Sequence, residues 1–404
     1  MQYKNKNYYV EKISTNKLIK KYKTPLYCYS YKKLVENINF IKSKFKKLSP
    51  IICFSVKSNS NLSILKELKK LQLGADVVSQ GELMKALNAG IDPKKIVFSG
   101  VGKTTSELSL AINKKILLIN VESKNEILEI EKIAKSKKKA VDIGIRLNPN
   151  TDAKTLKQIS TGKKENKFGV DERNFIELVN YSKNSKYLKL KCLSVHIGSQ
   201  ILDYKPYKKM LTVLSKLINK LNFNFEYVDL GGGMGISYQL DGKKLNYEKY
   251  SKEILEFKKK YGCKIIFEPG RSIIGNAGII ISKVIYLKET KSKCFVILDA
   301  AMNDLMRPAL YGAKHQIIPV NKNSKRSQKI YEFVGPICES TDKFLTSSNF
   351  QRLKQNDYII ICDVGAYGYS LSSNYNSRPK PAEVMVKAKK INLIQKRQKL
   401  KDLI

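Results

Sequence analysis

The chain has 404 residues, of which 42% are hydrophobic and 27% are charged, and this composition excludes disordered and fibrous proteins. No apolar run reaches about 18 residues, and the first residues lack the apolar core of a secretory signal, so we expect a cytoplasmic protein without membrane spans. The seven cysteines are widely spaced and only two histidines are present, which argues against a disulfide framework and a structural metal site.

The formal net charge of +41 raises the alternative of a protein that binds nucleic acid or an anionic membrane surface. Only about eight of the 76 basic residues are arginines, whereas nucleic-acid readers depend on arginine for two-pronged contacts. The lysines are spread along the whole chain, which favours biased codon usage over a binding face. We therefore expect no specific nucleic-acid partner, and salt-dependent binding to random DNA would test the alternative.

From about Ile51 to Ile274, short runs rich in β-branched residues alternate with amphipathic segments of helical periodicity. Eight such β/α units favour a closed (β/α)8 barrel over an open doubly wound sheet. The eight predicted strands are residues 51–56, 75–78, 95–98, 116–119, 141–148, 190–197, 225–230 and 264–268.

After Ile274 the pattern changes to alternating apolar and polar residues, which predicts a second, β-rich domain. We place the barrel at residues 36–274 and the β-rich domain at 1–35 and 275–404. The segment 24–30 has strand character and is expected to join the barrel edge or to pack with the second domain. For the basic tail, 387–404, we favour a packed strand and helix over a helix lying on a membrane.

Polar residues follow six of the predicted strands at their carboxyl ends, where (β/α)8 barrels place their active sites. In chain order they are Lys57, Asp76, Arg146, His196 with Ser199, Gly231 to Gly233, and Glu268. Any one of them alone is more often an ordinary loop residue or a core histidine. Their occurrence at six strand ends indicates an active site.

The glycine run in DLGGGMGI directly follows a strand, so its backbone N–H groups can approach a phosphate closely. The run does not fit the dinucleotide pattern GxGxxG, because Ile236 stands where the third glycine is required, and NAD is thereby disfavoured. The segment GVGKTT (100–105) is not a nucleotide P-loop, because Val97 occupies the position of the first glycine.

A lysine at the end of an apolar strand, a glycine cradle, a histidine and a carboxylate after the last strand together suit pyridoxal phosphate. Partial burial of Lys57 would lower its pKa and allow a Schiff base with the cofactor aldehyde. Glu268 would keep the pyridine nitrogen protonated, which strengthens the ring as an electron acceptor and favours decarboxylation. His196 would stack on the ring, the alternative being a histidine that only fills the barrel core.

Over nearly its whole length the chain resembles the diaminopimelate decarboxylases, bacterial pyridoxal phosphate enzymes of lysine biosynthesis. The resemblance is carried by FSVKSN, GADVVSQGEL, FSGVGKT, NVES, IRLNPN, ISTGKKENKFG, HIGSQ, DLGGGMGI, EPGRSI, DAAMNDLMRPALYGA, GPICESTD and GAYGYSLSSNYNSRPKPAEV. Three residues, Gln80, Met234 and Ala301, depart from the family pattern, and Gln80 is expected to add bulk near the site.

The resemblance implies a role for each matching residue. It makes Lys57 the cofactor-bound lysine and gives the catalytic residues as Lys57, Cys338, His196 and Glu268. The implied cofactor-binding residues are Lys57, Asp76, Arg146, His196, Ser199, Gly233, Glu268, Gly270, Arg271 and Tyr367. The implied substrate-binding residues are Arg271, Arg307, Tyr311, Glu339 and Tyr367, with Cys338 and Glu339 contributed by the partner subunit of a homodimer.

The implied reaction is loss of CO2 from the D-configured carbon of meso-2,6-diaminopimelate, which yields L-lysine in the last step of lysine biosynthesis. Cys338 is the favoured proton donor, because a thiol with a pKa near 8.5 can act as an acid near neutral pH. The alternative within the same fold is an ornithine- or arginine-type decarboxylase. The pair Arg307 and Tyr311 argues against it, since a second substrate carboxylate requires a cationic partner.

Overall fold

The computed structural model describes residues 1–153, 161–162, 165–238 and 243–404, and the chain divides into two compact units. One unit contains residues 40–236 and 243–271, and the other contains residues 1–39, 237–238 and 272–404. These bounds differ by a few residues from those placed on the sequence, and residues 237–238 group with the β-rich unit. Part of the ISTGKKENKFG motif (159–169) lies outside the described residues.

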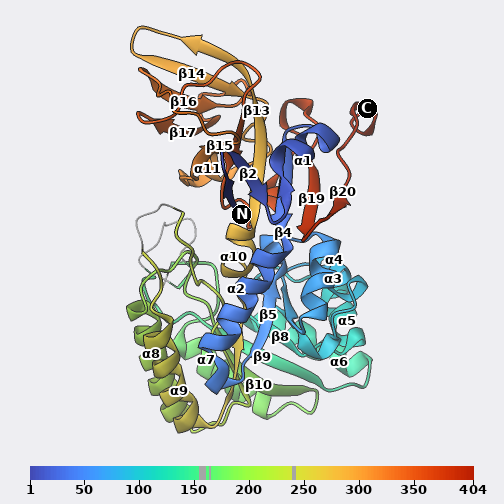
Figure 1. Cartoon of the computed structure of the whole chain (residues 1–404). Coiled ribbons are helices and arrows are strands. Elements are labelled where there is room, and N and C mark those ends of the chain that lie inside the picture. Colours follow the sequence, from blue (N-terminus) through green and yellow to red (C-terminus); the bar gives the residue numbers. More distant parts are fainter. Residues whose placement is uncertain (154–160, 163–164, 239–242) are drawn as a thin grey trace. The chain divides into compact units, whose positions relative to one another are not determined.

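The first unit is a closed barrel of eight parallel strands, which confirms the predicted (β/α)8 fold (Figure 1). Its strands are buried on both faces, and this explains why they appear in the sequence as nearly continuous apolar runs. In spatial order they are β10 (Leu188–Val195), β11 (Tyr227–Asp229), β12 (Lys264–Phe267), β5 (Ile51–Ser55), β6 (Gly74–Val77), β7 (Ile96–Phe98), β8 (Leu118–Val121) and β9 (Val141–Leu147).

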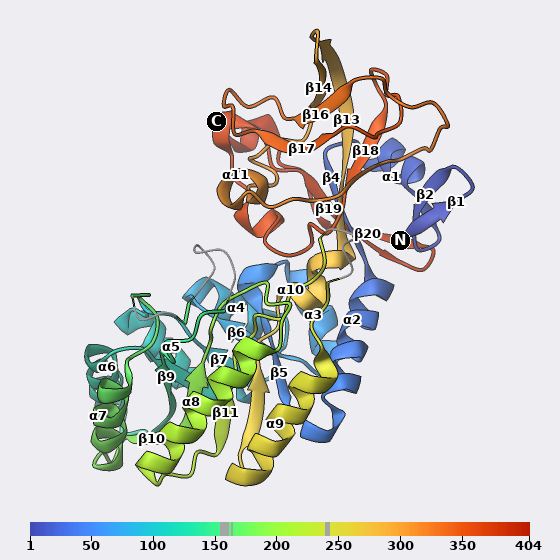
Figure 2. The same cartoon turned by 90° about the vertical axis from the view of Figure 1, so that its left-hand side faces the viewer.

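Helices surround the barrel, and α8 and α9 lie side by side on its outer surface (Figure 2). Several begin with a serine or threonine cap just after a strand: Ser79 accepts the N–H of Glu82, and Ser123 accepts that of Glu126. The helices of the barrel unit are α3 (Leu62–Lys70), α4 (Gln80–Asn88), α5 (Thr105–Lys114), α6 (Lys124–Ser136), α7 (Glu172–Lys183), α8 (Lys205–Leu221) and α9 (Tyr247–Tyr261). Two further helices, α2 (Tyr31–Lys44) and α10 (Arg271–Ile274), each contain residues of both units. Within the described ranges, no helix is both long and apolar enough to cross a membrane.

The β-rich unit is built on a nine-stranded sheet in which β4 (Leu26–Ser30) lies between β13 (Gly278–Glu289) and β19 (Ala382–Lys387). The segment 24–30, which was expected to be a strand, therefore packs with the second domain and not at the barrel edge. The other elements of this unit are β1 (Gln2–Lys4), β2 (Asn7–Val10), β3 (Ile13–Ser14), α1 (Thr15–Tyr22), β14 (Lys293–Leu298), α11 (Arg307–Tyr311), β15 (Ile317–Pro319), β16 (Ile330–Val334), β17 (Lys343–Ser347), β18 (Tyr358–Ile361) and β20 (Lys390–Gln395).

The carboxyl-terminal tail pairs with this sheet as β20, which is followed by one 3-10 turn at Leu400–Asp402. The predicted strand of the tail is therefore confirmed, the predicted helix is limited to this one 3-10 turn, and the alternative of a helix lying on a membrane is wrong. A core of buried aliphatic side chains, including Leu26, Ile279, Ile360 and Val384, joins β4, β13, β18 and β19.

Asp304 is a buried acid of the β-rich unit, with 1% of its surface exposed. Its carboxylate accepts the N–H of Ala301 at 2.9 Å and the amide of Asn303 at 3.2 Å. Burial raises the pKa of Asp304 to about 7, although the bond from Ala301 and the charge of Arg378 act in the opposite direction. The folded chain therefore binds this proton more tightly than the unfolded chain, where the pKa of an aspartate is about 3.9.

The tighter proton binding of Asp304 in the folded chain stabilises the fold. This stabilisation is complete below about pH 4 and is lost as the pH rises to about 7. We expect Asp304→Asn to remove it, so that the wild-type free energy of unfolding falls relative to the variant by up to about 1.4 kcal/mol per pH unit in this range. Urea titrations at several pH values measure the difference. The exposed Asp402→Asn is the control and should follow the wild type. Parallel curves for Asp304→Asn and wild type would contradict the raised pKa.

Candidate active site

Lys57 and Asp76 form an ion pair at the carboxyl ends of neighbouring barrel strands β5 and β6. The Lys57 Nζ lies 2.9 Å from the Asp76 Oδ2, which also accepts the Ser55 hydroxyl at 2.5 Å. Asp76 is fully buried, whereas 39% of the Lys57 side chain is exposed. Among the described residues, the Asp76 Oδ1 has no hydrogen-bond partner. The pair holds an accessible amine beside a buried carboxylate.

Asp229, at the end of β11, and Glu268, just after β12, form a buried carboxyl pair. Burial and the neighbouring Asp229 raise the pKa of Glu268 well above its usual range. Asp229 accepts the N–H of Gly231 at 2.9 Å on one oxygen and the amide of Asn120 at 3.1 Å on the other. Since N–H donors stabilise an ionised carboxylate, Asp229 carries the charge of the pair and Glu268 holds the proton.

Asn120 and Ser99 extend this pair across the barrel interior. The Asn120 amide donates to the Ser99 hydroxyl at 3.2 Å, and that hydroxyl faces the Glu268 Oε1 at 3.4 Å. Gly144 on β9 makes room for the amide, because a Cβ at this position would stand 2.2 Å from the Asn120 Oδ1. The glycine within a strand is therefore explained by the close approach of a neighbouring side chain.

His196 follows β10 and faces the glycine run after β11. Its Nδ1 accepts the N–H of Gly232 at 3.2 Å, so the ring hydrogen of the neutral form lies on Nε2. Burial lowers the pKa of His196 well below its usual value, and the charges of Arg146 and Lys57 act in the same direction. His196 thus presents an uncharged ring in the barrel.

The glycine run and the segments after β10 and β12 form a group of donors suited to an anion. Gly233 has a φ of +88°, a backbone conformation that glycine adopts readily. The Arg271 Nη2 donates to the Ser199 hydroxyl at 3.1 Å. A Cβ at Gly270 would stand 2.8 Å from the Ser58 side chain, so the chain closely approaches the 3-10 turn that follows β5. The barrel unit therefore contains four of the predicted cofactor-binding residues: Ser199, Gly233, Gly270 and Arg271.

Arg146 is held differently from the other predicted cofactor residues. Its Nη1 donates to the Glu122 Oε1 at 2.9 Å, and the guanidinium lies 5.0 Å from the centre of the Phe168 ring. The Glu122 carboxylate also accepts the N–H groups of Gly100 and Gly169. Within this unit, Arg146 helps to fix the loops after β7, β8 and β9.

The remaining predicted residues belong to the β-rich unit. Arg307 and Tyr311 lie on α11, and Tyr367 has a φ of +56°, which is uncommon for a non-glycine residue and a feature often found at functional sites. Cys338 and Glu339 are exposed. The side chain of Glu339 accepts the Thr341 hydroxyl at 3.0 Å and also the Tyr375 hydroxyl.

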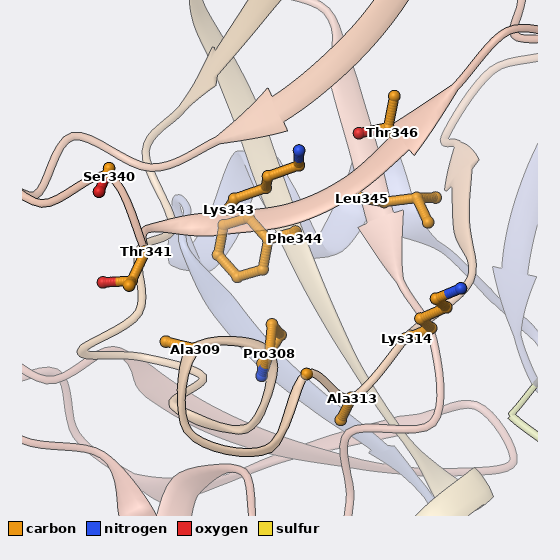
Figure 3. A pocket seen from close by; sticks show the side chains of 11 residues that line it. Pro308, Ala309, Ala313, Lys314, Ser340, Thr341, Lys343, Phe344, Leu345 and Thr346 are labelled. Carbon is orange, nitrogen blue, oxygen red and sulfur yellow. The ribbon is translucent and has the colours of Figure 1, made fainter.

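A pocket of about 500 Å³ lies between two segments of this unit. One segment follows Arg307 and the other follows Glu339. It is lined by Pro308, Ala309, Gly312, Ala313 and Lys314 on one side and by Ser340, Thr341 and Lys343 to Thr346 on the other, so none of the predicted substrate residues lines it (Figure 3). Asp342 fixes the second segment, because its carboxylate accepts the N–H groups of Met302 and Ile337 at 2.7 and 2.8 Å. The loop bearing Cys338 and Glu339 is thus anchored at both ends.

Several residues of the barrel site were not predicted from the sequence: Ser55, Ser99, Asn120, Glu122 and Asp229. All of them lie at or just beyond the carboxyl end of a barrel strand. The rule that identified Lys57 and Glu268 would have identified them too, had it been applied to every strand end. Gln80, expected to add bulk near the site, is exposed at the start of α4, where its N–H donates to Glu107.

Comparison with known proteins gives a consistent result. Residues 31–275 match the family model "Pyridoxal-dependent decarboxylase, pyridoxal binding domain". The chain is 44% identical to diaminopimelate decarboxylase from Helicobacter pylori over 96% of both chains, and 40% identical to that from Aquifex aeolicus over 98% of this chain and 95% of the relative. It is similar in structure to the H. pylori diaminopimelate decarboxylase complexed with L-lysine, with a TM-score of 0.92 and 43% identity over 96% of this chain and 98% of the other.

The barrel site fits pyridoxal phosphate. It offers an amine at Lys57, a buried oxygen of Asp76 with no protein partner among the described residues, an acid at Glu268 and hydroxyl and backbone donors around Gly233. These groups match the aldehyde, ring nitrogen and phosphate of that cofactor. The comparisons confirm the cofactor predicted from the sequence. The chain therefore belongs to the diaminopimelate decarboxylase family of pyridoxal-dependent decarboxylases.

Proposed function

We propose that this protein decarboxylates meso-2,6-diaminopimelate to L-lysine and CO2 with pyridoxal phosphate as cofactor. The observation that carries the proposal is the ion pair between Lys57 and the buried Asp76, which holds an accessible amine at the carboxyl end of the barrel. Such an amine is the attachment point that this cofactor requires. We also propose a cytoplasmic location, which the seven free cysteines support.

Pyridoxal phosphate supplies an electron-accepting ring for the electron pair that remains when CO2 leaves. Lys57 anchors the cofactor, and Asp76 keeps that amine in place. Glu268, which holds the proton of its pair with Asp229, provides the acid at the ring nitrogen. The uncharged ring of His196 offers a flat face, while Ser199, Arg271 and the backbone around Gly233 bind the phosphate.

For the substrate, we propose that Arg271, Arg307, Tyr311 and Tyr367 bind a carboxylate, with Tyr367 also contacting the cofactor phosphate. Cys338 would return a proton to the reacting carbon, and Glu339 would bind the distal amino group. We propose that these two residues serve the barrel of the partner subunit in a homodimer. Their exposure in the single chain supports this arrangement.

Release of CO2 from four separate substrates tests the proposed function. Purified holoenzyme is offered meso-diaminopimelate, ornithine, arginine or lysine at equal concentration. We expect release from diaminopimelate alone, because only this substrate carries a second carboxylate for an arginine to bind. Release from ornithine or arginine without release from diaminopimelate would favour the alternative decarboxylase.

Replacing Arg307 by lysine should raise the KM for diaminopimelate by about tenfold or more. A lysine retains the charge but cannot reproduce the planar pair of donors that a carboxylate accepts. Steady-state kinetics and cofactor titration of the same variant measure the effect. We expect the cofactor affinity to change much less than KM, and equal losses of both would mean that Arg307 has a structural role.

A further inference from the structure

His315, one of only two histidines in the chain, lies against Arg307 in the β-rich unit. Its Nε2 is 2.8 Å from the Arg307 Nη1, and its Nδ1 is 2.8 Å from the carbonyl oxygen of Cys362. Both side chains are buried, His315 with 1% and Arg307 with 5% of its surface exposed. No role was predicted for this histidine from the sequence.

The hydrogen-bond contacts of His315 with Arg307 and Cys362 fix its protonation state. The carbonyl oxygen of Cys362 can only accept a hydrogen bond, so the Nδ1 of His315 carries a hydrogen. The guanidinium of Arg307 can only donate, so the Nε2 presents a lone pair. The geometry therefore requires the neutral imidazole with its hydrogen on Nδ1. A protonated ring would place one N–H against another and a second positive charge beside Arg307.

The fold holds this contact in place. Ile317 of β15 pairs with Ile361 of β18, and the N–H of Cys362 donates to the Gln316 carbonyl at 2.9 Å, so the backbone fixes His315 beside Cys362. The Arg307 guanidinium also lies 4.6 Å from the centre of the Tyr238 ring, which meets the imidazole edge-on at 5.1 Å. Arg307 is thus oriented by an acceptor and by an aromatic face.

We propose that His315 is a positioning residue for substrate recognition, whose neutral imidazole orients the Arg307 guanidinium toward a substrate carboxylate. The proposal rests on the proposed function, in which Arg307 binds that carboxylate. Substrate binding then depends on pH, because protonation of His315 removes this acceptor of the Arg307 guanidinium. The KM for diaminopimelate should therefore rise on the acidic side, while kcat changes less.

The pH dependence caused by His315 must be distinguished from that of other charged groups near this contact. Burial raises the pKa of Asp363 to about 6, against the opposing charges of Lys33 and Arg307, so the charge of Asp363 also changes on the acidic side of neutrality. Among the residues that the structure describes, the titratable and charged groups near His315 include Arg307 and Tyr311 on α11, Tyr238, Lys314, and Cys362 and Asp363 after β18. Two experiments distinguish His315 from these groups. One observes only histidine side chains, and the other uses a variant whose residue 315 cannot be protonated.

The first test is nitrogen NMR of holoenzyme labelled only at histidine. Because the chain has two histidines, a His315→Gln spectrum assigns the signals. We expect the His315 ring to be neutral near pH 7.5, with its hydrogen on Nδ1. A ring hydrogen on Nε2, or a charged ring at this pH, would overturn the proposal.

The second test compares two substitutions that each keep one half of the imidazole. The oxygen of a glutamine side chain can occupy the Nε2 position and accept from Arg307, whereas asparagine reaches only the Nδ1 position near Cys362. We expect His315→Asn to raise KM about tenfold with kcat within about threefold, and His315→Gln to stay within about threefold of wild type in both. His315→Gln should also lose the acidic rise in KM.

Equal losses in both variants, or an unchanged KM in both, would overturn the positioning role. An acidic rise that persists in His315→Gln would assign the pH dependence to Asp363 instead. If His315→Asn does not fold, the KM profile of His315→Gln and the NMR spectrum decide the question. Arg307→Lys distinguishes the two proposals: an unchanged KM in that variant refutes the role given to Arg307, whereas the NMR result reports the contact independently.

Discussion

Lys57→Ala is expected to lose the visible absorbance of the cofactor-bound lysine and to release CO2 more than about a thousandfold more slowly than wild type. Lys57 presents its amine beside Asp76 with part of the side chain exposed. Lys103, which follows β7, does not offer a substitute, because its buried amine donates to Glu126 and to the carbonyl oxygens of Gly100 and Asn120. Absorbance spectra and CO2 release measure both effects.

Lys264→Ala is the matched control, because Lys264 stands at the amino end of β12, at the opposite end of the barrel from the site. Its ion pair with Glu226 is exposed, so we expect nearly wild-type activity and absorbance. Borohydride reduction followed by peptide mass spectrometry locates the attachment directly. A reduced cofactor found on a lysine other than 57 in the wild type would refute the assignment.

The barrel was predictable because its strands are short, buried and contiguous in sequence. Each predicted run from 51–56 to 264–268 overlaps one observed barrel strand, with ends displaced by at most a few residues. A parallel strand buried on both faces appears in the sequence as a short run of apolar residues. The helix that follows is recognised by its different, helical periodicity. The positions of Lys57 and Glu268 followed from the strand ends.

The sheet of the β-rich unit was not predictable in the same way, because its pairings join distant segments. β4 lies between β13 and β19, more than 200 residues further along the chain, and local periodicity carries no information about such neighbours. The contacts inside the barrel could not be predicted for the same reason. The bond from Asn120 to Asp229 and the space that Gly144 leaves for it depend on the register of three strands.

Mixing two inactive variants should restore activity if each active site uses both subunits. In that arrangement the Lys57→Ala and Cys338→Ala homodimers are each nearly inactive. After subunit exchange, about half of the dimers are mixed, and each mixed dimer carries both lesions in one site and none in the other. Activity should therefore recover to about a quarter of wild type. Mass spectrometry of the mixture verifies the exchange.

The reverse mixture provides the control, in which wild type exchanges with the double variant Lys57→Ala/Cys338→Ala. With shared sites, every mixed dimer has one lesion in each site, so only the wild-type homodimers contribute and about a quarter of full activity remains. If Cys338 instead serves the barrel of its own chain, each mixed dimer keeps one intact site and about half remains. That second result, with no recovery in the first mixture despite demonstrated exchange, would refute the composite site, because Cys338 would then act beside the Lys57 of its own chain.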